Sequence, residues 1–102
     1  MIDWQRIEEL KSDFGSEDFD EVVTLFLDEV EESFETLLAG NYSDLGNELH
    51  GLKGSAANLG FAVLKDACSA AEKDPQSADL AGLKTVFNDS RAIFLNQVRP
   101  AG

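Results

Sequence analysis

Apolar side chains recur at helical spacing through most of this chain, and that periodicity constrains the fold more than any other feature. Between residues 17 and 39 they recur every three or four positions, while acidic side chains fill the opposite face. Such a pattern is typical of an amphipathic α-helix with one buried face. The apolar positions of this segment are Phe19, Val22, Val23, Phe26, Val30, Phe34, Leu37 and Leu38.

Turn and capping residues divide the chain into five helical segments. Gly15 and Ser16 interrupt the pattern, and Gly40 and Gly60 stand where a helix ends. Ser77 can cap the last helix. We expect helices from Asp3 to about Phe14 (with Trp4, Ile7, Leu10 and Phe14 on one side), over 17–39, over 41–59, from Phe61 to just before Lys73, and from Ser77 onward, with residues 99–102 as a frayed tail.

These segments predict an all-α protein. Four long amphipathic helices joined by short loops favour an antiparallel up-down four-helix bundle, with an additional short N-terminal helix over one end or edge. Only two prolines and few β-branched runs argue against strands. At 102 residues the chain is long enough for one hydrophobic core, so we expect a single domain over residues 1–102.

The chain is strongly acidic, with a net charge of −12. Residues 1–40 carry 13 acidic and two basic side chains, whereas residues 41–102 carry seven acidic and six basic ones. This excess disfavours binding to nucleic acid or to an anionic membrane. The second half is nearly neutral, so an acidic protein partner would be repelled much less there.

A single cysteine, Cys68, excludes an intramolecular disulfide and a cysteine metal cluster. Its position in the helical pattern predicts a buried, inert thiol. The first residues lack a signal-peptide pattern, and no apolar run is long enough to span a membrane. We expect a soluble, cytoplasmic monomer without metal or cofactor, and the Met1 start and compact length favour a free-standing protein over a piece of a larger kinase.

The only histidine, His50, lies among very small side chains. In a helix over residues 41–59 the apolar positions fall within an arc of roughly 80°, and His50 points about 140° from its middle, toward solvent. Each glycine inside a helix costs about 1 kcal/mol relative to alanine. We therefore expect another protein to approach the imidazole closely. The small residues on this face are Ser43, Gly46, Gly54 and Ala57.

The run His50-Gly51-Leu52-Lys53-Gly54-Ser55-Ala56-Ala57-Asn58-Leu59-Gly60 resembles the signature of histidine-containing phosphotransfer (HPt) domains. That signature has a lysine three residues after the histidine, a glycine after four and another after ten. Chain length and helix order agree with it, so the resemblance covers almost the whole chain. It implies a carrier in a multistep two-component phosphorelay, whose partners are receiver domains of response regulators or hybrid histidine kinases.

The resemblance and the residue chemistry together predict the site. A neutral imidazole is a good nucleophile near pH 7, so His50 is the expected phosphoacceptor. Lys53 can bring positive charge to the phosphoryl oxygens, and Gly46, Gly54 and Ala57 leave room for the partner. By resemblance, the residue that orients the imidazole is Glu72 on the following helix; from the residues alone it could also be an ordinary exposed glutamate.

The chain has no glycine-rich nucleotide loop, so we do not expect it to phosphorylate itself from ATP. Two other functions stay open at this stage. One is a docking bundle that transfers no phosphate, although such a protein would have no need to keep His50 and Lys53. The other is a hydrolase with His50 as general base, which would need a nucleophile and a pocket that a convex helix face does not offer.

Overall fold

The computed structural model describes residues 2–98, and every regular element among them is helical. The elements follow the chain in the order α1 (Trp4–Leu38), α2 (Leu45–Leu59), α3 (Ala62–Lys73), η1 (Pro75–Ser77, a 3₁₀ turn) and α4 (Leu80–Val98). The all-α prediction is therefore confirmed for these residues. Residues 99–102, expected to form a tail, lie outside the described part.

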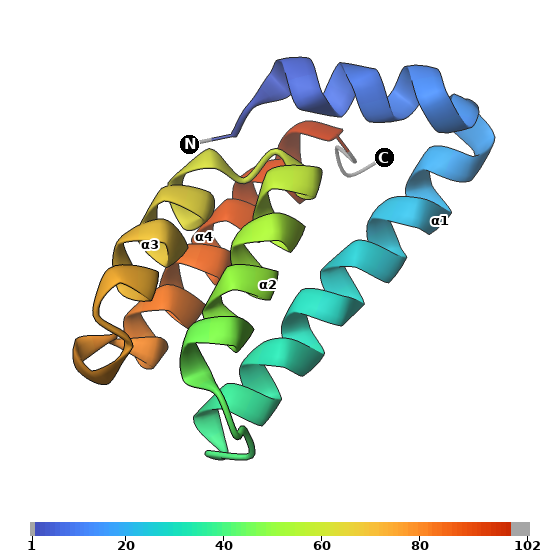
Figure 1. Ribbon diagram of the computed structural model, residues 1–102. Coiled ribbons are helices and arrows are strands. Elements are labelled where there is room, and N and C mark those ends of the chain that lie inside the picture. Colours follow the sequence, from blue (N-terminus) through green and yellow to red (C-terminus); the bar gives the residue numbers. More distant parts are fainter. Residues whose placement is uncertain (1, 99–102) are drawn as a thin grey trace.

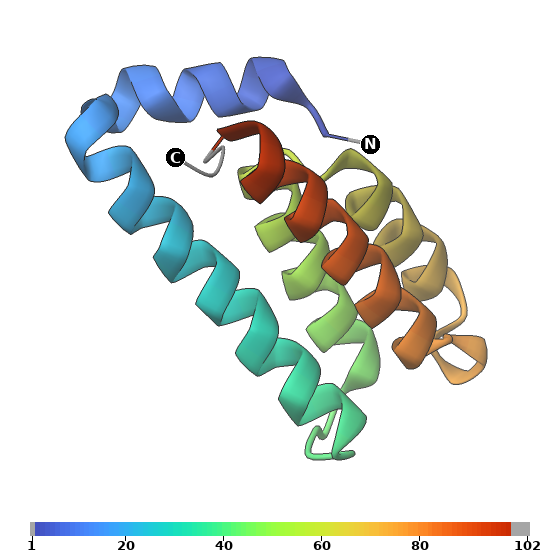
Figure 2. The same cartoon turned by 180° about the vertical axis from the view of Figure 1, so that it is seen from behind.

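The second part of α1 forms an antiparallel bundle with α2, α3 and α4 (Figure 1). Helices that follow one another in the chain pack against one another, and α4 closes the bundle against α1. The view from behind shows α4 beside α1 along the bundle (Figure 2). This arrangement is the predicted up-down four-helix bundle.

Gly15 divides α1 into two segments that run in different directions. Its φ of 77° and ψ of 160° interrupt the helix in a region that glycine adopts without strain. The segment before it, residues 4–14, crosses one end of the bundle, as predicted, and is called the N-terminal arm below (Figure 1). Ile7 and Leu10 of the arm are buried.

The apolar side of the N-terminal arm is only partly buried. Trp4 is 41% exposed and Phe14 is 43% exposed, although the helical pattern places both on the same side as the buried Ile7 and Leu10. The two aromatic residues lie at the two ends of the arm. Helical phase alone does not bury them there, because burial also needs a neighbouring element that covers the side chain.

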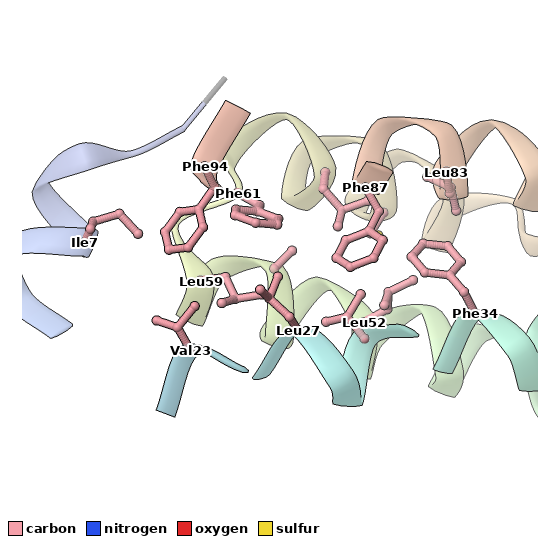
Figure 3. Close-up of a cluster of buried hydrophobic side chains, with 14 of the residues drawn as sticks. Ile7, Val23, Leu27, Phe34, Leu52, Leu59, Phe61, Leu83, Phe87 and Phe94 are labelled. Atoms are coloured by element: carbon pink, nitrogen blue, oxygen red, sulfur yellow. The ribbon is translucent and has the colours of Figure 1, made fainter. Parts of the chain in front are cut away.

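A ladder of phenylalanines runs through the core. The ring centroids are 5.6 Å apart for Phe34 and Phe87, 6.2 Å for Phe87 and Phe61, and 5.8 Å for Phe61 and Phe94. Phe34 comes from α1, Phe61 precedes α3, and the other two come from α4, so the ladder joins three of the four helices (Figure 3). Buried leucines of α2 complete the core, so α2 presents one face to the core and leaves the opposite face free.

Helix α2 begins at Leu45 rather than at residue 41, which corrects the expected start. The Asp44 side chain accepts a hydrogen bond from the Asn47 N–H at 3.1 Å, which makes it the N-cap. Asn41 instead donates its own N–H to Thr36 at 3.0 Å and so belongs to the end of α1. Ser43 therefore precedes the helix and does not lie on its face.

Helix α4 is capped by Asp79 and not by Ser77. Asp79 Oδ1 accepts from the Gly82 N–H at 2.9 Å, whereas the N–H of Ser77 donates to Asp74 inside the 3₁₀ turn. Pro75 favours this turn because its ring fixes φ and it has no N–H to satisfy. The extended backbone of Ala78 then separates Ser77 from the helix.

Gly60 joins the end of α2 to the N-terminal arm. It ends α2 with a φ of 73°, which confirms the predicted C-terminal cap. Its carbonyl accepts from the Asp3 N–H at 2.6 Å, and Arg6 donates from Nε to the Asn58 carbonyl at 3.1 Å. A Cβ at Gly60 would lie 2.8 Å from the Asp3 carbonyl oxygen, so this approach requires glycine.

Candidate functional site

His50 lies on the solvent face of α2. Its side chain is 68% exposed, which is the orientation that the helical phase predicts. The opposite face is buried through Leu49, Leu52, Ala56 and Leu59, and Leu45 is half-buried. Packing of these residues fixes the rotation of α2 in the bundle, so the imidazole is held outward by the core.

Glu72 of α3 contacts both His50 and Lys53. One carboxylate oxygen, Oε1, lies 2.5 Å from Nδ1 of His50, and the other, Oε2, accepts a hydrogen bond from Lys53 Nζ at 2.8 Å. The Glu72 side chain is 20% exposed and that of Lys53 is 30% exposed. All three predicted polar residues thus form one connected cluster along the α2–α3 edge.

The charge of Glu72 determines which nitrogen of His50 is free. The hydrogen bond from Lys53 holds the pKa of Glu72 below its usual value; partial burial opposes this effect, and the contact with His50 adds to it. Glu72 is therefore ionised at neutral pH, and a carboxylate only accepts hydrogen bonds. Nδ1 of His50 must then carry the proton, so the lone pair of a neutral ring lies on Nε2.

The small residues near His50 differ in what surrounds them. A Cβ built on Gly54 would meet nothing within 4 Å, and Ala57 is exposed. Gly46 is half-buried, and a Cβ there would lie 3.5 Å from Asp44 Oδ1 and 3.6 Å from Pro75 Cγ. No close contact within the chain therefore requires the glycine at position 54, and the space beside His50 is open on that side.

Cys68 lies one turn before Glu72 on α3, with no exposed surface. Burial raises the pKa of its thiol to about 11, and the nearby Glu72 carboxylate adds to the shift. The thiolate is the reactive form of cysteine, so this side chain is a core residue and not a nucleophile. The expectation of a buried thiol is confirmed.

A groove lies between α1 and α2 that was not predicted from the sequence. It is about 520 Å³ in volume and includes Glu29 and Glu32 of α1 and Glu48 and Gly51 of α2 in its lining. The acidic excess of residues 1–40 was visible in the sequence, but it does not tell which glutamates face α2. That depends on how α1 is rotated against its neighbours.

Two further findings concern the part of the chain that the structure describes. Among residues 2–98, no three histidine, cysteine, aspartate or glutamate side chains are grouped so that they could hold a metal ion. None of the helices in this range combines the length and the apolar character that a membrane span requires.

Comparison with known protein families places the chain in a family. A family model described as Hpt domain matches residues 21–93, from the second part of α1 to α4, and this range includes His50, Lys53 and Glu72. Comparisons with curated proteins and with solved structures give no match. The N-terminal arm lies outside the matched range.

Proposed function

The chain belongs to the Hpt domain family, and on this premise we propose that His50 carries the phosphoryl group. Domains of this family act in histidine phosphotransfer within two-component phosphorelays. The observation that carries the proposal is the single histidine, 68% exposed on α2, whose Nδ1 contacts the Glu72 carboxylate at 2.5 Å. An exposed imidazole with one nitrogen held and the other free suits a carrier that must enter another protein's active site.

In the proposed step the lone pair of His50 Nε2 attacks the phosphorus of an aspartyl phosphate on a receiver domain. The N–P bond forms while the bond between phosphorus and the aspartate oxygen breaks, and the aspartate leaves as a carboxylate with the electron pair. The imidazole ring becomes positive as the bond forms. Glu72 stabilises that charge through the proton on Nδ1, and it fixes the ring so that Nε2 points outward.

Lys53 supports this step in two ways. It lies one turn from His50 on α2, where its ammonium can stabilise negative phosphoryl oxygens. In the resting protein it donates to Glu72, which keeps the carboxylate ionised and in position. Gly54 and Ala57 leave the space that the receiver needs beside the ring, and Gly46 borders it on the side of Pro75.

We expect the chain to accept the phosphoryl group from one receiver domain and to pass it to another, since the transfer is chemically reversible. The receivers belong to response regulators or hybrid histidine kinases. The chain acts as a carrier and does not use ATP. We also propose that it works as a monomer in the cytoplasm; a net charge of −12 disfavours self-association, which light scattering would test.

The test is incubation with a phosphorylated receiver domain, followed by measurement of acid-labile phosphate on the chain. Wild type should become labelled, and His50→Gln should take up no label while keeping its helicity and cooperative unfolding. A hydrolase would release phosphate without a labelled intermediate on His50, and a docking bundle would bind without transfer. Label that persists in His50→Gln would disprove the assignment.

A further inference from the structure

The groove between α1 and α2 runs beside His50 on the side away from Lys53. Along α2, the groove lining extends from Asn47, about 60° around the helix from His50, to Glu48 at about 160°, whereas Lys53 stands about 60° in the other direction. A protein that covers His50 and extends toward α1 therefore reaches this groove.

Three carboxylates line the groove without a positive partner. Glu29, Glu32 and Glu48 are exposed, and within the described residues none of them forms an ion pair. The nearby cations pair with other carboxylates: Lys53 pairs with Glu72, and Lys84 pairs with Glu31 toward α4. The chain thus leaves mutual repulsion in the groove that a basic partner would relieve.

The groove is also open on its α2 wall. A Cβ on Gly51 would meet nothing within 4 Å, so no contact within the chain requires a glycine there. A specific protein interface buries about 800 Å² on each partner, far more than the exposed surface of one histidine. A receiver centred on His50 must therefore contact the flanks of α2 as well.

We propose that this groove docks a basic segment of the receiver domain that exchanges phosphate with His50. The inference rests on the proposed function and adds the chemistry of the partner. Lys53 and Glu72 balance one another on one flank, whereas the three unpaired carboxylates leave the other flank negative, and this difference gives the site a polarity. The receiver orients with its aspartyl phosphate over His50 and Lys53 and with lysine or arginine side chains over the groove.

The experiment compares two variants with the same change in net charge. The groove variant combines Glu29→Gln, Glu32→Gln and Glu48→Gln. The control combines Glu8→Gln, Asp18→Asn and Asp89→Asn, which are exposed and lie outside the groove lining. The probe is a receiver domain, phosphorylated with acetyl phosphate, that transfers to the wild-type chain. Second-order transfer rates are measured at low and high salt.

The groove variant should transfer about tenfold more slowly at low salt and lose most of its salt dependence, since steering by charge acts on association. The control should stay near wild type. Both variants should react normally with phosphoramidate, a small donor that needs no docking. Wild-type transfer by the groove variant, or an equal loss in the control, would overturn the inference. If wild-type His50 took up no phosphate even from phosphoramidate, the proposed function itself would be disproved, whatever the groove variant showed.

Discussion

Glu72 Oε1 lies 2.5 Å from Nδ1 of His50, so the most exposed polar group of the site is held by a residue of the neighbouring helix. The two residues are 22 positions apart in the sequence, and only the packing of α2 against α3 brings them together. The orientation of the imidazole therefore depends on the bundle being folded. This coupling between fold and site leads to the first two predictions.

The stabilising effect of Glu72 should depend on pH. Its pKa is lowered in the folded protein relative to the unfolded chain, chiefly by the hydrogen bond from Lys53. A lowered pKa contributes stability that is fully present above the unfolded value and is lost as pH falls through the folded value. In urea unfolding, wild type should exceed Glu72→Gln in stability at pH 7, and the difference should shrink toward pH 3. A difference that is independent of pH would contradict this.

Lys53 and Glu72 should behave as one unit in phosphoryl transfer. Lys53→Met removes the ammonium that holds Glu72, and Glu72→Gln removes the charge that it holds, so each variant weakens the same support of His50. Both should slow transfer from a phosphorylated receiver, while Lys53→Met alone costs about 1 kcal/mol or less in stability. The double variant should lose less than the product of the two single effects. Multiplicative losses would mean that Lys53 acts on the phosphoryl group alone.

Most of this site could be predicted from the sequence because helical periodicity determines which residues share a face. The 3.6-residue period defines which side of α2 is buried, and the exposure of His50 and the nearby position of Lys53 follow from it. Glu72 needed the family resemblance, since periodicity does not tell which residue of α3 meets His50. The acidic groove could not be predicted at all, because it depends on the rotation of α1 against α2.

The N-caps of α2 and α4 also depend on neighbouring structure that the sequence pattern does not show. Asp44 and Asp79 are the N-caps of α2 and α4, whereas the sequence pattern predicted a start at residue 41 and a cap at Ser77. Several polar residues near a helix start can serve as the cap, and neighbouring turns decide among them. Here the end of α1 engages Asn41 and the 3₁₀ turn engages Ser77.

Cys68 should not react while the protein is folded. Its side chain has no exposed surface, and its pKa is raised to about 11 by burial and by Glu72, so the thiolate is scarce near pH 8. An aromatic disulfide reagent should titrate no thiol in the native protein and one thiol per chain in denaturing urea. Rapid labelling of the native protein would show that α3 opens on the time scale of the reaction.

Alanine substitution should change the free energy of unfolding in opposite directions at Gly60 and at Gly51. Gly60→Ala would strain a residue with a φ of 73° and push against the Asp3 carbonyl, so it should lower the free energy of unfolding by at least about 1 kcal/mol. Gly51→Ala adds a Cβ into open space inside a helix and should raise it by up to about 1 kcal/mol. Urea unfolding of both variants checks this. Equal effects would mean that Gly60 has neither its positive φ nor its contact with Asp3 in solution.

Substitutions at Gly54 should affect stability and phosphoryl transfer in different ways. A Cβ at this position meets nothing within 4 Å, so Gly54→Ala should stabilise the helix by up to about 1 kcal/mol. Gly54→Gln gains part of the same propensity, but its side chain enters the space that a receiver needs beside His50. We expect Gly54→Gln to slow transfer from a phosphorylated receiver at least tenfold, a loss of about 1.4 kcal/mol in transition-state stabilisation. Its reaction with phosphoramidate should stay near wild type, because a small donor needs no such space. Equal slowing with both donors would mean that the glutamine disturbs the imidazole itself, and wild-type transfer from the receiver would mean that close approach does not require this glycine.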